Sequence, residues 1–283
     1  MAFETIAVLG GRGMLGSDLV RHAESLDYAV CVYDLPEFDM TDDGCLDEVV
    51  ANSDGVVNCA AYTNVEKAES DVELANQVNG YAVGRLGQIA KESGIPVLHI
   101  STDFVFDGTK VSPYIESDPP NPVSVYGGSK LLGEELLAES GCEYCIVRVQ
   151  WTYGKSGTNF ITKITEAAQT RDELNVVDDQ VGSPTHTGEI AKVILDLLKM
   201  DPFPTGLYHC AASGCVSRYE MTQYLFEQLG RPIKINPCKT SDFKTAAQRP
   251  LNSRFDCTKL EALLGRSIPT WQQMLDNYLN PER

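Results

Sequence analysis

Short apolar runs alternate with amphipathic stretches through the first half of the chain, and this alternation constrains the fold more than any other feature. The apolar runs are rich in Val and Ile, lack polar alternation, and predict strands at 5–9, 29–33, 55–58, 96–101 and 144–149. Helical patterns between them lie near 14–26, 43–51, 71–93 and 124–140. Strands without polar alternation are typical of a sheet covered on both faces, and strand–helix–strand repetition predicts parallel pairing. The sequence therefore predicts an α/β fold with a doubly wound parallel sheet.

The pattern becomes irregular after about residue 150. Helices are expected near 157–170, 188–200, 218–229 and 271–279, with strands near 174–178 and 207–211 and prolines between them. We expect residues 1–150 to form the sheet domain and residues 151–283 to form a smaller α/β lobe. This lobe is expected to close over the carboxyl ends of the strands, where ligands bind in such sheets. Segment 183–200 is expected to pack back on the first domain.

Composition excludes several classes of protein. The 283 residues are 43% hydrophobic and 22% charged, which is typical of a globular chain, and no apolar run reaches the roughly 18 residues of a membrane span. The net charge of −17 argues against binding to nucleic acid or anionic membranes, and any anionic substrate must be held by local donors. The N-terminal residues lack the basic start and apolar core of a signal peptide. We therefore expect a cytoplasmic protein.

Nine cysteines are present, and we expect most of them to be buried, reduced thiols. Cys142 and Cys145 have the spacing of a redox or metal pair. They have no second pair and no nearby histidine, and an apolar run follows them directly. The sequence favours two core cysteines at the start of a strand over a metal site.

A glycine-rich segment follows the first expected strand directly and opens the first helix. Gly10, Gly13 and Gly16 let the chain turn tightly and let backbone N–H groups approach a pyrophosphate, while Met14 and Leu15 lie in the same turn. The helix N-terminus adds a partial positive charge, so this site needs no basic side chains. The alternative is a glycine-rich turn required only for packing. We interpret the segment as the dinucleotide-binding turn of a Rossmann-type sheet.

Two charged residues favour different cofactors. Asp34 ends the second expected strand, 18 residues after Gly16, where a carboxylate accepts the ribose hydroxyls of NADH and repels a 2′-phosphate. Arg12, inside the turn, could instead pair with the 2′-phosphate of NADPH. Asp34 could also be a solvated strand end. Asp39 and Met40 follow closely and are expected to contact the adenine, and the sequence leaves NADPH and NADH open.

A Tyr–Lys pair lies on the helix expected over 124–140. Tyr126 and Lys130 share one helix face because they are four residues apart. An ammonium group close to a phenol favours the phenolate, which makes the phenol a usable acid or base nearer neutral pH. Thr102 ends the preceding strand and could hold a carbonyl oxygen. The alternative is an exposed helix pair, but the three side chains together predict a carbonyl-reduction site.

An ordered series of motifs runs through nearly the whole chain. It comprises Gly10-Gly-Arg-Gly-Met-Leu-Gly16, Asp39-Met-Thr-Asp42, Val57-Asn-Cys-Ala-Ala-Tyr-Thr63, Val65-Glu-Lys-Ala-Glu69, Val78-Asn79, His99-Ile-Ser-Thr-Asp-Phe-Val-Phe-Asp-Gly108, Tyr126-Gly-Gly-Ser-Lys130, Trp151-Thr-Tyr-Gly154, Asn159-Phe160, Asp179-Gln-Val-Gly-Ser-Pro-Thr185 and Arg249-Pro-Leu-Asn-Ser253. In these motifs the chain resembles the extended short-chain dehydrogenase/reductases, and within them the dTDP-4-dehydrorhamnose reductases.

The resemblance implies NAD(P)H-dependent reduction of the C4 ketone of dTDP-4-dehydro-β-L-rhamnose to dTDP-β-L-rhamnose. It implies that Tyr126 gives a proton to the developing alkoxide, that Thr102 hydrogen-bonds that oxygen, and that Lys130 binds the nicotinamide ribose and lowers the pKa of Tyr126. Further cofactor contacts are implied for Ala60, Ala61 and Tyr62, and substrate contacts for Val65, Asp103, Phe104, Trp151, Asn159 and Arg249. Trp151 could instead be a core aromatic residue, and Arg249 could be part of a surface ion pair.

The sequence also departs from this family. Phe104 stands where the family usually carries Tyr, and Met14 replaces the usual Gln. Some members form homodimers around Mg²⁺ held by acidic side chains, and Asp18 and Glu189 lie roughly where those carboxylates would be. Asp18 is shorter than the usual Glu, and a carboxylate in a first helical turn is favoured by the helix dipole alone. The sequence therefore favours no metal, and leaves a homodimer open.

Two alternative functions remain open at this point. Relatives with this fold serve as regulatory subunits of methionine adenosyltransferase and do not catalyse a reaction. Other relatives act as reductases or epimerases on different nucleotide-linked keto-sugars, and a fold cannot separate these cases. The presence of Thr102, Tyr126 and Lys130 together favours an enzyme, because a pure binding protein has no need of a tuned phenol.

Overall fold

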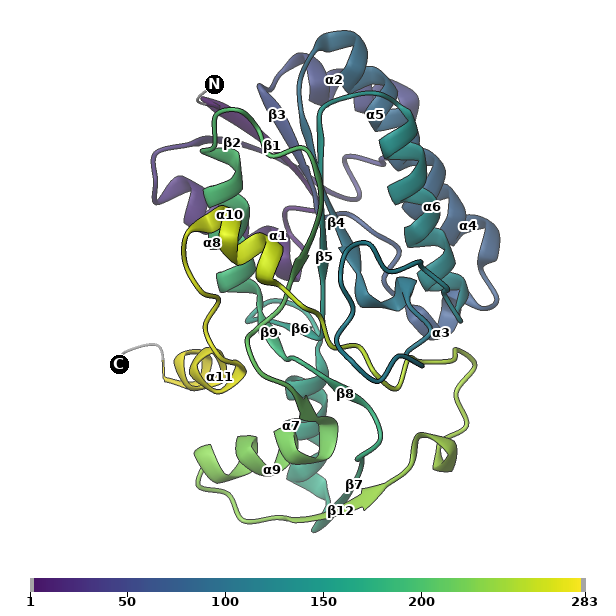
Figure 1. Cartoon of the computed structure of the whole chain (residues 1–283), viewed down its shortest axis with the longest axis vertical. Helices are drawn as coiled ribbons and strands as arrows, with labels where there is room; N and C mark the ends of the chain where they lie inside the picture. The colour runs from purple at the N-terminus through teal and green to yellow at the C-terminus, as the bar shows by residue number, and fades with distance from the viewer. Residues whose placement is uncertain (1–2, 281–283) are drawn as a thin grey trace.

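A six-stranded sheet forms the centre of the molecule in the computed structural model, which describes residues 3–280 (Figure 1). Its strands, in their order across the sheet, are β10 (Gly206–Cys210), β5 (Tyr144–Val149), β4 (Val97–Thr102), β3 (Gly55–Asn58), β1 (Thr5–Leu9) and β2 (Ala29–Tyr33). Each neighbouring pair in this sheet is parallel. The predicted α/β fold with a doubly wound parallel sheet is confirmed.

Helices cover both faces of the sheet. The first face carries α1 (Met14–Glu24) and α8 (Thr187–Leu198), and the second carries α2 (Asp43–Ala51), α5 (Ala82–Ser93) and α6 (Val125–Glu139) (Figure 1). Successive side chains of a strand point to opposite faces. Ile6 and Val8 therefore join the core beside α1 and α8, whereas Ala7 and Leu9 join the core beside α2 and α5. This double burial is the reason why the strands lack polar alternation.

One expected strand is not covered on both faces. Strand β2 is at the edge of the sheet, and its residues are mostly exposed or half-buried; Val32, for example, is 40% exposed. The expectation of double burial is wrong for this strand because no further strand lies beyond it.

The helix predicted over 71–93 is not uniform. It consists of α4 (Val72–Asn76), a π-helix (Gln77–Tyr81) and α5. In the π-helical turn, the Asn79 amide donates to Ser129 of α6 and accepts from the backbone N–H of Tyr62. A π-helical turn inside an α-helix re-aims its side chains, and such turns often lie at functional sites. Here the turn directs Asn79 toward the helix that carries Tyr126 and Lys130.

A small separate unit in the second part of the chain is built from two helices and a parallel pair of strands. Helices α7 (Phe160–Thr170) and α9 (Arg218–Gln228) pack on β7 (Glu173–Val177) and β12 (Lys234–Cys238) around a separate apolar cluster. The remaining elements are short and complete the described fold: α3 (Val65–Ala68), the 3₁₀ turn Asp103–Val105, β6 (Thr152–Tyr153), β8 (Val181–Gly182), β9 (Thr185–His186), β11 (Val216–Ser217), the 3₁₀ turn Thr240–Asp242, α10 (Thr258–Leu264) and α11 (Trp271–Leu279). Helix α3, α10 and β12 were not predicted, because four to seven residues carry little periodicity.

The chain returns to the sheet after residue 186. Helix α8 packs along α1, and β10 adds to the sheet beside β5 (Figure 1). The assignment of separate binding roles to residues 1–150 and 151–283 stays a prediction.

All nine cysteines are free. Cys142, Cys145 and Cys210 are buried, Cys215 is exposed, and the others are half-buried, so the expectation that most are buried is wrong. Cys142 and Cys145 do lie at the start of β5, as predicted. Within residues 3–280, none of the helices is both long and apolar enough to cross a membrane.

Candidate active site

The carboxyl ends of five adjacent strands, β5, β4, β3, β1 and β2, open into one cavity of about 620 Å³. The parallel register places the ends of β1, β3, β4 and β5 at the same edge, so the segments that follow them meet there. Most of the predicted site residues line this cavity: Gly10, Gly13, Met14, Leu15, Asp34, Asp39, Met40, Ala60, Ala61, Val65, Thr102, Asp103, Phe104, Tyr126, Lys130, Trp151 and Asn159. Residues far apart in sequence thus share one site.

The glycines of the turn after β1 have different structural roles. Gly10 has φ +70°, and a Cβ on it would lie 2.8 Å from the backbone of Ala60. A Cβ on Gly16 would lie 2.1 Å from the carbonyl oxygen of Gly10, so Gly16 lets α1 begin against the turn. Gly13 is the N-cap of α1 and lines the cavity, and a Cβ there would meet Gly10 O at 3.1 Å. Gly10 and Gly16 therefore hold the turn together, whereas Gly13 keeps the cavity wall open.

The charged residues at the end of β2 are arranged around Asp34. Its carboxylate accepts hydrogen bonds from the backbone N–H groups of Arg12 (2.8 Å) and Leu35 (2.9 Å) and lines the cavity. The Arg12 side chain does not line the cavity; its guanidinium is exposed and pairs with Glu37 at 2.7 Å. The carboxylate is thus fixed at the cavity wall, while the arginine is directed outward. A ribose contact for Asp34 stays a prediction.

Two other predicted cofactor residues do not line the cavity, and both support its walls. Gly16 packs against the carbonyl oxygen of Gly10 and so lets α1 begin against the turn. The Tyr62 hydroxyl donates to Asp71 at 2.8 Å, and the Tyr62 backbone is held by Asn79. A cofactor contact for either residue stays a prediction.

The Tyr–Lys helix lies very close to the end of β4. The first turn of α6 is capped by Ser124, whose hydroxyl accepts from the backbone N–H of Gly127 at 3.1 Å. A Cβ on Gly127 would lie 2.1 Å from the carbonyl oxygen of Phe104, so glycine is required at this position. The approach places Tyr126 beside Thr102 at the wall of the same cavity and in edge contact with the Phe104 ring, at 5.5 Å between ring centroids.

The protonation of Tyr126 differs from the prediction. Burial raises the pKa of Tyr126 to about 12, the neighbouring Thr102 hydroxyl lowers it, and the negative charge of Asp103 raises it further. A lowered pKa from Lys130 was predicted, but Lys130 is directed elsewhere. Its ammonium donates to the carbonyl oxygen of Ile100 at 2.7 Å and lies 3.1 Å from His99 Nε2. The phenol is therefore protonated near neutral pH, which is the form that can donate a proton.

Lys130 is the last of three buried polar residues in contact with one another, and this series was not predicted from the sequence. The Asn58 side chain accepts from the backbone N–H of Ala60 at 3.0 Å and places its amide nitrogen 3.2 Å from His99 Nδ1. The other ring nitrogen of His99 faces Lys130. Burial lowers the pKa of Lys130 to about 8 and holds the pKa of His99 well below its usual value. The histidine within the apolar run of β4 is the sequence feature that could have predicted this series of buried polar residues.

Helix α6 is fixed to its neighbours on two sides. Arg148 of β5 forms a buried two-point ion pair with Glu134, with a distance of 2.8 Å between Nε and Oε1. On the other side, Asn79 donates to Ser129, and a Cβ on Gly133 would lie 2.1 Å from the Asn79 carbonyl oxygen. Such fixed contacts hold Tyr126 and Lys130 in place before any ligand binds.

The far end of the cavity is formed by residues from the second part of the chain. Trp151 follows β5 with φ +43°, which is rare for a bulky residue and common at functional sites. The Asn159 side chain caps α7 through the backbone N–H of Thr162 and donates to Gly154 O, so it already has partners. A substrate contact for Asn159 stays a prediction.

A second cavity of about 220 Å³ adjoins this end and shares Phe104, Trp151 and Arg218 with the larger one. Arg249 lines it, and its guanidinium pairs with Glu66, so the ion pair considered from the sequence is present. Arg218 was not predicted. Its position just after a short strand and at the start of a helix was the only local sign.

Asp18 and Glu189, considered as metal ligands, have other partners. Asp18 pairs with Arg21 and accepts from the Thr187 hydroxyl. Glu189 pairs with Arg266 at 2.9 Å and with Lys192 at 3.2 Å. Across residues 3–280, no group of three His, Cys, Asp or Glu side chains is arranged to hold a metal ion. The residues present do not fit a Mg²⁺ site.

The buried carboxylate of Asp103 predicts a pH effect on stability. Burial raises the pKa of Asp103 to about 6, while the neighbouring Ser253 and Thr102 hydroxyls and the positive charge of Arg218 oppose the rise. A group whose folded pKa lies above its unfolded value of 3.8 stabilises the fold below that value and loses this contribution as the pH rises through about 6. From pH 4 to 7, the free energy of unfolding of the wild type should therefore fall by on the order of 2 kcal/mol relative to Asp103→Asn. Urea unfolding across this range measures the difference, and parallel curves would contradict it.

The comparisons with known proteins agree with this geometry. The model of the RmlD substrate binding domain family matches residues 4–283. The chain belongs to the RmlD substrate binding domain family. It is 37% identical over 282 residues to a dTDP-4-dehydrorhamnose reductase of Sinorhizobium fredii, covering 95% of this chain and 94% of that protein. The resemblance inferred from the motifs is confirmed.

Solved structures with similar sequences have the same fold. A dTDP-4-dehydrorhamnose reductase from Clostridium acetobutylicum is 34% identical, with a TM-score of 0.94 over 98% of this chain and 99% of that one. A dTDP-4-dehydrorhamnose reductase from Bacillus anthracis, solved in complex with NADP, is 31% identical, with a TM-score of 0.93 over the same shares of the two chains.

Proposed function

We propose that this chain is a reductase that uses NADPH or NADH to reduce the C4 ketone of dTDP-4-dehydro-β-L-rhamnose to dTDP-β-L-rhamnose. One observation carries the proposal: Tyr126, Thr102 and Lys130 line the same cavity as the glycine turn after β1. The names of the relatives at 31 to 37% identity support the same reaction and the use of a nicotinamide cofactor.

The cavity fits a dinucleotide cofactor. Gly13 leaves its wall open beneath the N-terminus of α1, and Asp34 is placed for the ribose hydroxyls. Asp39, Met40, Ala60 and Ala61 line the same side and are the proposed adenine-side contacts. When bound, the cofactor supplies a hydride to the carbonyl carbon. Lys130 would hold the nicotinamide ribose from the opposite wall.

The chain's own side chains complete the reduction. Thr102 would hydrogen-bond the C4 oxygen, and the protonated phenol of Tyr126 would give its proton to that oxygen as the carbon gains a hydride, so the ketone becomes a secondary alcohol. Val65 and Trp151 would pack on the sugar, and Asn159 and Arg249 would face the nucleotide. In this proposal residues 1–150 bind the cofactor and residues 151–283 provide most of the substrate contacts.

A direct assay tests the function. Purified protein is mixed with NADPH or NADH and dTDP-4-dehydrorhamnose, and loss of absorbance of the reduced nicotinamide is followed. We expect turnover and a product reduced at C4. No turnover, with tight binding to a methionine adenosyltransferase, would show the regulatory alternative. Turnover with another nucleotide-linked keto-sugar in place of this one would correct the substrate.

Removal of the Asp34 carboxylate should change cofactor preference. Asp34→Ala is expected to raise the ratio of kcat/KM for NADPH to that for NADH by about tenfold, since a carboxylate at this position favours ribose hydroxyls and repels a 2′-phosphate. Asp47→Ala, which removes an exposed carboxylate of α2 outside the cavity, is the control. An unchanged ratio in Asp34→Ala would contradict the ribose contact.

The proposal includes a cytoplasmic location and a homodimer. The nine free cysteines support a reducing compartment. Light scattering on the purified protein measures the oligomeric state, and cell fractionation measures the location.

A further inference from the structure

The buried contacts among Asn58, His99 and Lys130 limit where their protons can lie. The Asn58 side-chain oxygen, Oδ1, accepts from the backbone N–H of Ala60 at 3.0 Å, and a backbone N–H can only donate. The other atom of the Asn58 amide, Nδ2, therefore faces His99 Nδ1, at 3.2 Å. Since an amide nitrogen donates and does not accept, Nδ1 of His99 must be the acceptor of this pair.

The acceptor role of Nδ1 decides the tautomer of His99. Burial holds the pKa of His99 well below its usual value, so the ring is neutral. A neutral imidazole has one N–H and one acceptor nitrogen, and the hydrogen bond at one nitrogen sets the role of the other. Because Nδ1 accepts, the proton of His99 is on Nε2, and this N–H faces Nζ of Lys130 at 3.1 Å.

An ammonium group cannot accept this hydrogen bond. A charged lysine has three N–H donors and no lone pair, so the N–H groups of His99 and Lys130 would face each other. The uncharged amine has a lone pair for His99 Nε2–H and an N–H for the carbonyl oxygen of Ile100, 2.7 Å away. Every polar contact of the series is then satisfied, as is normal for buried polar groups. One further N–H of Lys130 remains for a ligand in the cavity that Lys130 lines.

The surroundings of Lys130 do not require a positive charge. Burial lowers the pKa of Lys130 to about 8, against the influence of Glu134 on the same helix and of Cys59 after β3. The Glu134 carboxylate is already paired with Arg148, and burial raises the pKa of Cys59 to about 12, so this thiol is uncharged. A hydrogen bond donated to the amine favours the uncharged form and lowers the pKa of Lys130 further.

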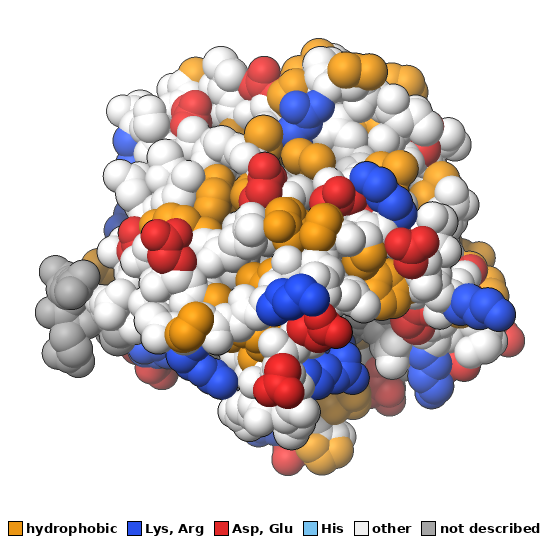
Figure 2. Space-filling model, turned by 90° about the horizontal axis from the view of Figure 1, so that it is seen from below, with side chains coloured by type: hydrophobic (Ala, Val, Ile, Leu, Met, Phe, Trp, Pro, Cys, Tyr) orange, Lys and Arg blue, Asp and Glu red, His pale blue; other side chains and the backbone are white. Residues whose placement is uncertain are grey.

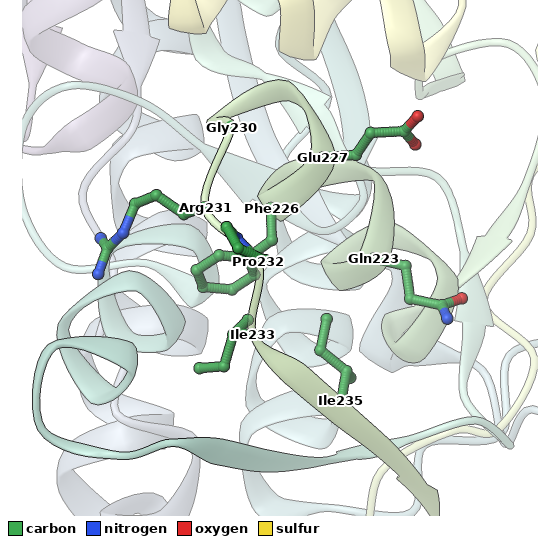
Figure 3. Close-up of a pocket in the computed structure, with 8 residues that line it drawn as sticks. All are labelled: Gln223, Phe226, Glu227, Gly230, Arg231, Pro232, Ile233 and Ile235. Atoms are coloured by element: carbon green, nitrogen blue, oxygen red, sulfur yellow. The ribbon is translucent and has the colours of Figure 1, made fainter.

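Counting donors decides a protonation state only where water is excluded. On the face shown in Figure 2, Lys and Arg side chains lie at the surface among Asp and Glu side chains. At the open groove near the end of α9, Glu227 and Arg231 are exposed, so water can serve an unmatched donor (Figure 3). Asn58 and His99 are both 0% exposed, so their contacts must be satisfied within the protein.

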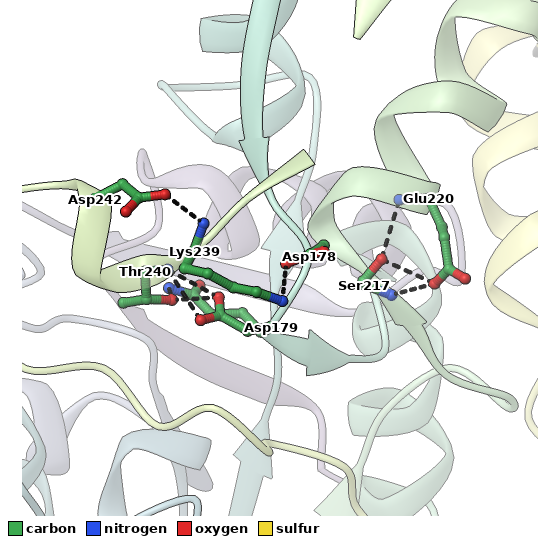
Figure 4. Close-up of polar contacts among 8 residues, drawn as sticks. Asp178, Asp179, Ser217, Glu220, Lys239, Thr240 and Asp242 are labelled. Carbon is green, nitrogen blue, oxygen red and sulfur yellow. Dashed lines mark hydrogen bonds and ion pairs between the residues drawn. The ribbon is translucent and has the colours of Figure 1, made fainter. Parts of the chain in front are cut away.

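A surface lysine of the same chain shows the opposite arrangement. Lys239 is exposed, and its Nζ lies 2.8 Å from the Asp178 carboxylate, which can only accept (Figure 4). The hydrogen bond to Asp178 raises the pKa of Lys239 above its usual 10.5. Lys130 instead faces a nitrogen that carries a proton, so its pKa should move in the other direction.

We propose that His99, with its tautomer set by Asn58, donates from Nε2 to an uncharged Lys130 amine in the protein without cofactor, and that both are positioning residues for the cofactor. With Nζ held by His99 and Ile100, one N–H remains to bind the nicotinamide ribose. This role rests on the proposed function, whereas the proton positions do not. The uncharged amine also adds no positive charge beside the Tyr126 phenol, whose pKa is raised and not lowered.

NMR of the protein without cofactor tests the proposal. The ¹⁵N shifts of the four histidine rings, assigned through the backbone, show which ring nitrogen carries the proton, and His99 should carry it on Nε2. The Cε signal of Lys130, identified by its loss in Lys130→Arg, should titrate with a midpoint below 8, the value that burial and the neighbouring charges set. Lys239 should titrate above 10.5 in the same spectra.

Two substitutions separate a hydrogen-bonding role of His99 from a purely structural one. His99→Gln supplies a carbonyl oxygen that can accept from an ammonium, so the Lys130 midpoint should rise above 8. His99→Leu supplies neither donor nor acceptor and should leave the midpoint near 8, with NADPH affinity reduced about three- to tenfold because Nζ loses a fixed partner. His22→Gln, on α1 and outside the cavity, is the control and should change neither quantity.

An Nδ1–H tautomer of His99, or a wild-type Lys130 midpoint above 8, would overturn the proposal, and these two measurements decide it if a variant does not fold. Equal midpoints in His99→Gln and His99→Leu would also overturn it, as would unchanged NADPH affinity in His99→Leu. If the tautomer and midpoint are as expected but the keto-sugar is not reduced, the proposed function fails alone. If the keto-sugar is reduced by a protein with the Nδ1–H tautomer, this inference fails alone.

Discussion

Tyr126→Phe is expected to reduce kcat for ketone reduction by about a hundredfold or more, with cofactor affinity nearly unchanged. The phenol lines the cavity beside Thr102 and is protonated near neutral pH, because burial raises the pKa of Tyr126 to about 12. Phenylalanine keeps the ring and its edge contact with Phe104 but removes the proton. Steady-state kinetics with NADPH and the keto-sugar measures kcat, and quenching of protein fluorescence by NADPH measures cofactor affinity.

The matched control is Tyr81→Phe, which removes a hydroxyl from an exposed tyrosine outside the cavity. This variant should reduce the keto-sugar at the wild-type rate. If Tyr126→Phe also turns over at the wild-type rate, Tyr126 is not the proton donor. If it loses NADPH affinity instead, its main role is to support the cofactor site.

Gly13→Val should abolish measurable cofactor binding, a loss of a hundredfold or more, while the chain remains folded. Gly13 has φ −71° and ψ −180°, a conformation that valine adopts easily, and a Cβ there would meet only Gly10 O, at 3.1 Å, among the described residues. The added side chain would fill the wall where the pyrophosphate is expected to approach the backbone. NADPH titration measures the affinity, and thermal unfolding shows whether the fold is kept.

Gly16→Ala is the informative comparison. A Cβ at this position would lie 2.1 Å from Gly10 O, inside the backbone of the turn, so this variant should lose thermal stability as well as cofactor affinity. Wild-type NADPH affinity in Gly13→Val would show that the cofactor does not lie against this turn.

Much of the sheet could be predicted because its signals are local. The apolar runs at 5–9, 29–33, 55–58 and 144–149 match β1, β2, β3 and β5 residue for residue. Hydrophobic patterning reports burial on both faces of a strand, but it does not report the order of the strands. The exposed edge position of β2 therefore differed from the prediction.

Site residues could be predicted where a short segment of sequence contains the residue types and the spacing that indicate a function. The glycine turn, Asp34, and the helical pair Tyr126 and Lys130 were identified this way, and the structure brings their cavity-lining members together. Side-chain direction was less predictable. The guanidinium of Arg12 points to Glu37, and Lys130 points to His99 and not to Tyr126.

The sequence by itself determined the parallel sheet, the turn after β1 and the residue types at the strand ends, because backbone conformation and burial depend on neighbours within a few positions. Only the tertiary structure decided which charges are paired and which protons are held. Arg218 lies beside Trp151 and Asp103 lies beside Ser253, contacts that join segments distant in sequence. Desolvation and pairing depend on these long-range contacts, so the raised pKa values of Tyr126 and Asp103 appear only once the chain is folded.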